Sequence, residues 1–169
     1  MKVGIKKEHL TEYIIKPVCI GLRKWSQSSE NLLLGTCAQE TLMGHYLVQL
    51  EGGPARGIYQ HEKPTFICDI ENYLAFNESE SSLLCGMFSI PGLEYLKHQF
   101  DRLTYDLAFA TAMARLHYAR FPEPLPDPDD VLGLARYYKK YWNGAGERGG
   151  KATESQFIDN YERFVLQEL

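Results

Sequence analysis

Apolar residues recur along most of this chain at the three- and four-residue intervals of helices that each bury one face. The first such segment, about residues 7–23, carries Leu10, Ile14, Ile15, Val18 and Leu22. This spacing predicts an amphipathic helix. We expect it to be bent or interrupted at Pro17, because proline lacks a backbone donor and clashes with the preceding turn.

The next segment predicts a second helix, after which the hydrophobic pattern is no longer helical. The helix would begin at a cap on Ser28 or Ser29 and stop at Gly44. Residues 45–60 then alternate only weakly and contain a Gly-Gly-Pro turn. They predict a loop with at most a small hairpin, in which residues 57–60 are short enough to be extended.

The second half of the chain predicts further helices. One opens at Pro64, a long one covers residues 100–120, and a third runs from an Asp127 cap to about Tyr141. A proline-rich connector separates the last two. After a glycine-rich loop, Thr153 begins a capping-box pattern for the final helix. With about six helices and almost no sheet, the chain is predicted to be one mainly α domain over residues 1–169.

Composition narrows the class of protein. The 169 residues suit one domain with a real core, and the formal charge of −4 argues against broad nucleic-acid binding. No apolar run is long enough to span a membrane. The charged segment Met1–His9 is not followed by an apolar region, so we expect no secretory signal.

Cysteine and histidine spacing indicates neither disulfides nor a metal. The four cysteines form no C-x-x-C pair, which favours small buried hydrophobes in a reducing cytosol over disulfides. The five histidines show no H-x-x-x-H spacing, so we assign no metal and no cofactor.

Glu40 is the most informative polar residue. It follows Cys37 by three positions and Leu33 by seven, which places it on the apolar face of its helix. It also lies in the last turn before Gly44, where the helix dipole disfavours negative charge. Both effects would raise its pKa, as a general acid near neutrality requires. The alternative interpretation is a side chain that turns to solvent or pairs with Arg56.

The residues around Glu40 carry a family resemblance. Ala38-Gln39-Glu40-Thr41 is followed by Gly57-Ile58-Tyr59-Gln60, then Pro64-Thr65, and later Lys140-Tyr141-Trp142-Asn143-Gly144-Ala145-Gly146. In this order the elements resemble the signature of soluble lytic transglycosylases and goose-type lysozymes. The resemblance covers about residues 30–146.

The chain departs from that signature at several positions. Thr41 stands where the family has Ser, Tyr59 where it has Met, and one extra residue precedes Pro64. Trp142 occupies the place of a family Tyr, unless Tyr141 supplies the hydroxyl from one position earlier.

The resemblance implies a lysozyme-like fold that cleaves the β-1,4 bond between N-acetylmuramic acid and N-acetylglucosamine in peptidoglycan. Glu40 would be the catalytic acid. The sugar would be bound by five further side chains: Gln60, Tyr59, Tyr141, Trp142 and Asn143. Amides can orient N-acetyl groups, and aromatic faces can pack on pyranose rings. Core packing is the other interpretation of Tyr59, and Tyr46 is equally open to both.

A second catalytic carboxylate is not evident. Glu51, Glu62, Asp69 and Glu71 are the available residues, and we interpret each as a solvated charge. An inverting hydrolase needs two carboxylates, whereas a transglycosylase needs one, because the 6-hydroxyl of the sugar closes a 1,6-anhydro ring. We therefore expect the mechanism that uses a single glutamate.

The late part of the chain resembles bacteriophage proteins of the same superfamily, on the residues Tyr137–Asn143, 150–153 and 156–158. This implies a protein made in the cytoplasm and carried by a virion to the bacterial cell wall, with glycan strands and other virion proteins as partners. The alternative is a tail or structural virion protein that keeps the fold without useful catalysis.

Overall fold

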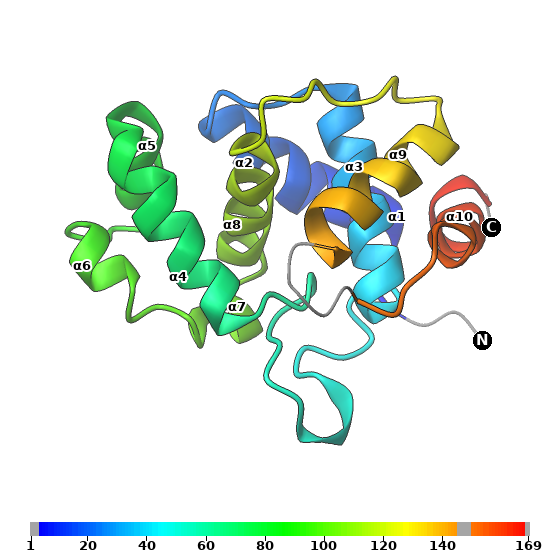
Figure 1. Cartoon of the computed structure of the whole chain (residues 1–169), viewed down its shortest axis with the longest axis horizontal. Coiled ribbons are helices and arrows are strands. Elements are labelled where there is room, and N and C mark those ends of the chain that lie inside the picture. The colour runs from blue at the N-terminus through cyan, green and yellow to red at the C-terminus, as the bar shows by residue number, and fades with distance from the viewer. Residues whose placement is uncertain (1–3, 145–149, 168–169) are drawn as a thin grey trace.

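The computed structural model describes residues 4–144 and 150–167. Helices make up most of this part of the chain, and its only β-type pairings are isolated bridges from Arg56 to Val48 and to His61. The helices enclose one hydrophobic core (Figure 1). The prediction of a mainly α single domain is therefore confirmed.

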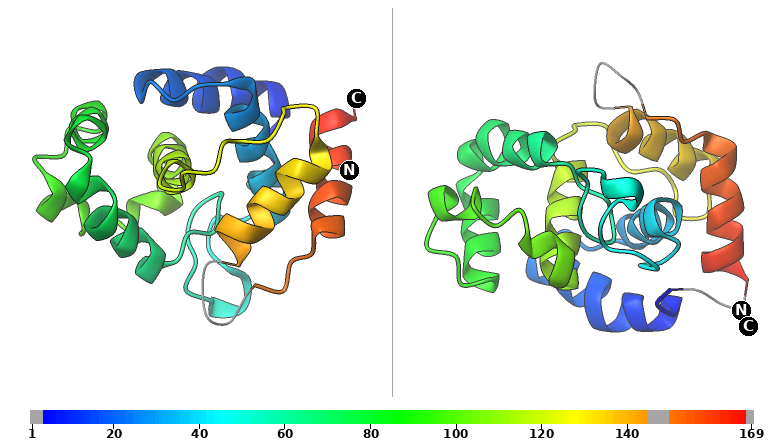
Figure 2. Two further views of the ribbon diagram at one scale, coloured as in Figure 1. Left: turned by 45° about the horizontal axis from the view of Figure 1, so that its top comes forward. Right: turned by 90° about the horizontal axis from the view of Figure 1, so that it is seen from below.

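Helix α3 (Gln27–Thr41) is the central element. It contacts η1 (Thr11–Ile15), α8 (Leu107–Ala119), α9 (Val131–Tyr138) and α10 (Glu154–Tyr161). Figures 1 and 2 show α3 among α8, α9 and α10. Its residues from Leu32 to Ala38 are all buried. Gly35 permits the close approach of α10, because an added Cβ would lie 2.2 Å from Cζ of Phe157. The helix begins after Ser26, whose hydroxyl accepts from the backbone of Ser29, so the predicted caps at Ser28 or Ser29 are wrong by two or three residues.

The first predicted helix is present and is interrupted where proline requires it. It consists of α1 (Lys7–Leu10), a π-helical turn η1 (Thr11–Ile15) and α2 (Lys16–Gly21). The π turn ends two residues before Pro17, which has no backbone N–H to donate and whose ring clashes with the carbonyl of the preceding turn.

The middle of the chain contains α4 (Lys63–Asn72), η3 (Leu74–Phe76), α5 (Glu78–Met87) and α6 (Leu93–Leu96). Pro64 lies in the first turn of α4, as predicted. Elements η3, α5 and α6 were not predicted. Figure 1 shows α4, α5 and α6 together at the end of the molecule away from α10.

The predicted long helix at residues 100–120 is in fact two helices, α7 (Arg102–Tyr105) and α8 (Leu107–Ala119). The break is at Asp106, whose carboxylate accepts from the backbone of Phe109 at 2.9 Å and so caps α8. A capping aspartate inside an apolar pattern therefore starts a new helix.

The C-terminal helices are α9 (Val131–Tyr138) with a π-helical end η4 (Lys139–Asn143), and α10 (Glu154–Tyr161) continued by η5 (Glu162–Leu166). The cap of α9 is Asp130 and not Asp127. Asp127 instead accepts from the backbone of Asp129 in a local turn. The capping box at Thr153 is confirmed.

The segment between α3 and α4 hangs below the helices in Figure 1 and contains η2 (Leu50–Gly52). Residues 57–60 form a turn between bridged residues 56 and 61 and are not extended. Gly57 has φ +78°, and a Cβ there would lie 2.4 Å from the carbonyl oxygen of Leu103. Only glycine suits this position, which holds the turn against α7.

All four cysteines are free, and Cys19 and Cys37 are buried. Burial raises the pKa of each of these two thiols to about 12. Among the described helices, none combines the length and the apolar character that crossing a membrane would require.

Candidate functional site

Glu40 lies in the last turn of α3, as the sequence predicted, and its side chain is half-buried. The helix ends one residue later, where Leu42 takes a left-handed conformation with φ 52°. The backbone carbonyl of Glu40 accepts a 2.6 Å hydrogen bond from the hydroxyl of Tyr46. Tyr46 thus closes the end of the helix and helps to fix the position of Glu40.

The Glu40 carboxyl is held by the hydroxyl of Tyr138 at the end of α9, which donates to Oε1 at 2.6 Å. Burial raises the pKa of Glu40 to about 7, although the Tyr138 hydrogen bond opposes the rise and the negative charge of Glu62 adds to it. Near neutral pH the carboxyl is therefore divided between its acid and carboxylate forms. Burial, with the charge of Glu40 next, raises the pKa of Tyr138 far above its ordinary value, so Tyr138 remains a donor.

Asn143 is brought to the same place by the π-helical end η4. Its side chain forms a hydrogen bond with the hydroxyl of Tyr138, and this bond opposes the rise in the pKa of Tyr138. Lys139 donates to Oδ1 of Asn143 at 2.7 Å and to the carbonyl of Gly150. Asn143 therefore lies one hydrogen-bonded neighbour away from Glu40, although 103 positions separate them in the sequence.

The 57–60 turn is joined to the end of α3 through Thr41, whose hydroxyl donates to the carbonyl of Ile58 at 2.8 Å. Within the turn, the Gln60 amide donates to the carbonyl of Gly57 at 2.9 Å. Arg56 does not pair with Glu40. Its guanidinium donates to the carbonyls of Gly53 and Ala55.

The aromatic candidates have a different placement from the one expected. Tyr59 is only 1% exposed, and its hydroxyl bonds to Thr111. It is a core residue, so the prediction that it binds sugar is wrong. Tyr141 and Trp142 are half-buried. The Tyr141 hydroxyl donates to Glu123. The Trp142 ring packs edge-on against the buried ring of His117, with 4.9 Å between the two ring centroids.

The hydroxyl that holds Glu40 comes from neither of the two positions considered. Tyr138 supplies it from one helical turn before Tyr141 and Trp142. The sequence signal was the Tyr137-Tyr138 pair on the preceding helix. The pattern alone could not show which of the two tyrosines faces α3.

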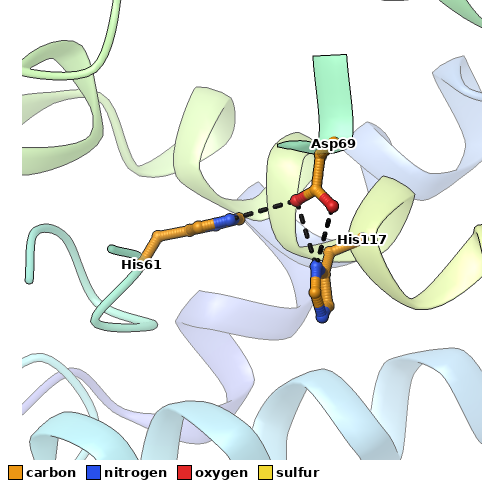
Figure 3. Close-up of side chains that lie close together, drawn as sticks. All are labelled: His61, Asp69 and His117. Carbon is orange, nitrogen blue, oxygen red and sulfur yellow. Dashed lines mark hydrogen bonds and ion pairs between the residues drawn. The ribbon is translucent and has the colours of Figure 1, made fainter. Parts of the chain in front are cut away.

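A second group of ionisable side chains lies nearby in the core: His61, Asp69 and His117 (Figure 3). Their exposed fractions are 3%, 0% and 1%. Nε2 of His61 is 3.1 Å from Oδ2 of Asp69, and Nδ1 of His117 is 3.0 Å from both carboxylate oxygens. Arg120 donates to Oδ1 at 2.6 Å. We refer to these three residues as the His–Asp–His cluster.

The interpretation of Asp69 as a solvated charge is therefore wrong, although Glu51, Glu62 and Glu71 are exposed as expected. Burial alone would raise the pKa of Asp69, but hydrogen bonds from His117 and His61 outweigh it and hold the pKa well below 3.8. Burial lowers the pKa of His61. Local spacing could not reveal the cluster, because 8 and 48 positions separate the histidines from Asp69.

Comparison with protein-family models, with curated proteins and with solved structures found no match for this chain.

Proposed function

We propose that the protein cleaves the β-1,4 bond between N-acetylmuramic acid and N-acetylglucosamine in peptidoglycan, with Glu40 as its single general acid and base, on a lysozyme-like fold. One observation carries the proposal. Glu40 is a half-buried carboxyl with a pKa of about 7, and a tyrosine hydroxyl holds one of its oxygens. A group of this kind can both give and take a proton near neutral pH.

The Tyr138 hydrogen bond determines which oxygen carries the proton. Because the hydroxyl donates to Oε1, the acid form of Glu40 has its proton on Oε2. In the first step this proton passes to the glycosidic oxygen as the bond from that oxygen to C1 breaks. The carboxylate that remains keeps the Tyr138 hydrogen bond, which is stronger to a charged acceptor.

In the second step the same carboxylate acts as the base. It removes the proton from the 6-hydroxyl of the muramic sugar while that oxygen bonds to C1, which closes a 1,6-anhydro ring and restores the acid. One glutamate therefore suffices, and no water has to be activated by a second carboxylate.

Asn143 and Gln60 are the residues that we assign to substrate positioning. Asn143 lies beside the Tyr138 hydroxyl, and Gln60 lies on the turn that Thr41 joins to the end of α3. Their amides can donate to and accept from N-acetyl groups, which orients the sugar without proton transfer. Replacing either by Ala should reduce activity less than changing Glu40.

The test is cleavage of purified sacculi by the wild type, Glu40→Gln and, as a matched control, Glu162→Gln on the exposed surface of η5. We expect the Glu40 variant to lose cleavage and the control to retain it. Mass spectrometry of the products should find 1,6-anhydro ends. Reducing ends would instead indicate hydrolysis, and Glu51→Gln and Glu62→Gln would then identify the second carboxylate.

The alternative function is a virion component without useful catalysis. It would be supported if the folded wild type left sacculi intact at every pH. Full activity of the Glu40→Gln variant would instead remove Glu40 from the mechanism. Association with a virion is a further part of the proposal, and proteomic analysis of purified particles would test it.

A further inference from the structure

The His–Asp–His cluster joins three parts of the chain at one buried point: the bridge at residue 61, helix α4 and helix α8 (Figure 3). The possible ligand atoms of the three side chains all lie within 4.8 Å of one another. Burying two imidazoles and a carboxylate is unfavourable unless something compensates the loss of water. The proposed glycan cleavage uses none of these groups.

The hydrogen bonds of His117 show that a positive charge is needed at this point. Its Nε2 is 2.8 Å from the carbonyl oxygen of Tyr141, and a carbonyl can only accept, so Nε2 must carry a proton. If the imidazole is neutral, Nδ1 then carries no proton and can only accept a hydrogen bond. Nδ1 faces both oxygens of Asp69 at 3.0 Å, where two acceptors would repel each other. Either a second proton on His117 or a metal ion must lie between them.

His61 supplies the next observation. Its Nε2 faces Oδ2 of Asp69, whereas its Nδ1 is buried and has no hydrogen-bond partner among the described residues. The neutral imidazole is the form that binds metals, and His61 Nε2 already points at the carboxylate that would share the ion. A buried neutral imidazole beside a carboxylate is a ready pair of ligands.

We propose that His61 Nε2, the Asp69 carboxylate and His117 Nδ1 bind one divalent cation of the zinc class. Two imidazoles and a carboxylate are ligands that zinc prefers. Each histidine nitrogen lies 3.0–3.1 Å from a carboxylate oxygen, close to the roughly 3.3 Å that separates two ligands bound tetrahedrally at about 2.0 Å. The three ligand atoms together lie within 4.8 Å of one another.

The surroundings of His117 and Asp69 support these two ligands in the manner of known metal sites. The distal nitrogen of His117 donates to the Tyr141 carbonyl, which fixes the ring with Nδ1 toward the ion. Arg120 orients the carboxylate through Oδ1, while Oδ2 faces both histidines. On binding, the ion replaces the proton on Nδ1 of His117, which leaves to solvent, and the His61 proton moves from Nε2 to Nδ1.

Arg120 also brings a positive charge close to the site, and this gives the proposal a distinctive prediction. The guanidinium repels the incoming cation while it pairs with Asp69. Arg120→Gln should therefore tighten zinc binding, by about tenfold for a unit charge removed near a partly buried site. A purely structural arginine would not have this effect.

The experiment uses the full chain, unfolded and refolded in chelator or with Zn²⁺, since the site is buried and the ion enters most readily during folding. Titration calorimetry, elemental analysis and Co²⁺ absorption should find one ion per chain, with about one proton released on binding. The zinc-refolded protein should also have the higher melting temperature. His61→Gln should lose the ion, and the control His98→Gln, at an exposed histidine, should keep it.

Two results would overturn the proposal. One is a wild type that refolds without binding Zn²⁺ or Co²⁺ at one per chain, since His117 would then hold the second proton. The other is equal loss of binding in the His61 and His98 variants, which would indicate surface histidines. If His61→Gln does not fold, the wild type and Arg120→Gln still decide, because tighter binding without the arginine is expected only for an ion beside Asp69. No outcome depends on cleavage of peptidoglycan.

Discussion

The pKa values of two carboxyl groups in this domain, those of Glu40 and Asp69, are shifted in opposite directions. Burial raises the pKa of Glu40 to about 7, whereas hydrogen bonds from two histidines hold the pKa of Asp69 well below 3.8 against the effect of burial. Both residues lie in the last turn of a helix, α3 for Glu40 and α4 for Asp69. The helix dipole disfavours both charges and so does not explain the difference.

The hydrogen-bond donors around each carboxyl group explain the difference between the two pKa values. Asp69 receives hydrogen bonds from two imidazoles and a guanidinium. Within residues 4–144 and 150–167, the Glu40 carboxyl receives one, from the neutral hydroxyl of Tyr138. A carboxylate that accepts from several donors, one of them a guanidinium, is kept ionised even in the core, and one that accepts from a neutral hydroxyl is kept near its midpoint. The first arrangement suits a structural or ligand-binding anion, and the second suits an acid that must also act as a base.

The largest expected effect comes from neutralising Asp69. Asp69→Asn leaves the Arg120 guanidinium without its counter-ion and removes the charged acceptor that both imidazoles face. It should lower the free energy of unfolding by about 3–5 kcal/mol at pH 7. Urea unfolding in the presence of chelator measures it, with Asp101→Asn, at an exposed aspartate, as the control.

The pH dependence of this effect has a definite sign. The folded pKa of Asp69 lies below the ordinary value of 3.8, so its stabilisation is present above that pH and is lost as the pH falls toward the folded value. The gap between wild type and Asp69→Asn should therefore close only in strong acid. A gap of equal size at every pH would show that the carboxylate charge is not the stabilising feature.

Glu40→Gln should act in the opposite direction on stability. The folded pKa of about 7 exceeds the ordinary 4.5, so the stability contributed by the protonated form is present below pH 4.5 and is lost as the pH rises through 7. The variant should match the wild type in acid. Above pH 7 it should be more stable by about 1–3 kcal/mol, after allowance for partial exposure.

Cleavage of sacculi should fall by about 10²–10⁴-fold in the same variant. Wild-type activity should decline as the pH rises above 7, because the acid form of Glu40 is lost. The stability effect is measured by thermal melts at pH 4 and pH 8, and the effect on activity by a pH–rate profile. Lower stability at pH 8 in the variant would contradict the assignment of Glu40 as a buried acid.

Much of the fold was predictable from local physics. The helical periodicity, the interruption at Pro17, the start of α4 at Pro64 and the capping box at Thr153 depend on a few neighbouring residues, and the structure confirms all of them. The helix break at Asp106 was missed because an apolar pattern continues on both sides of the capping aspartate.

The candidate site was predictable only in part, for a similar reason. The position of Glu40 in the last turn on an inward face follows from its own helix. The partner Tyr138 and the burial of Tyr59 depend on how distant helices pack. The His–Asp–His cluster has no local signature, because its residues come from a bridge, α4 and α8.

Tyr138→Phe sharpens the comparison by removing the hydroxyl that donates to the Glu40 carboxyl. The hydrogen bond lowers the pKa of Glu40 against the effect of burial. Without it the pKa should rise by about one pH unit. The alkaline limb of the pH–rate profile should move upward, and the maximal rate should fall because the carboxylate loses its stabilising donor. An unchanged profile would remove Tyr138 from the site. Tyr95→Phe, at an exposed tyrosine, is the control.

The smallest expected effect is that of Glu62→Gln. Glu62 is exposed at the start of α4, and its charge raises the pKa of Glu40. Removing that charge should lower the Glu40 midpoint by about 0.3 pH units in low salt, and the difference should vanish at high ionic strength, because solvent screens an exposed charge. A pH–rate profile at two salt concentrations measures it. Loss of activity at every pH would instead assign Glu62 a direct chemical part, which a transglycosylase with a single glutamate does not require.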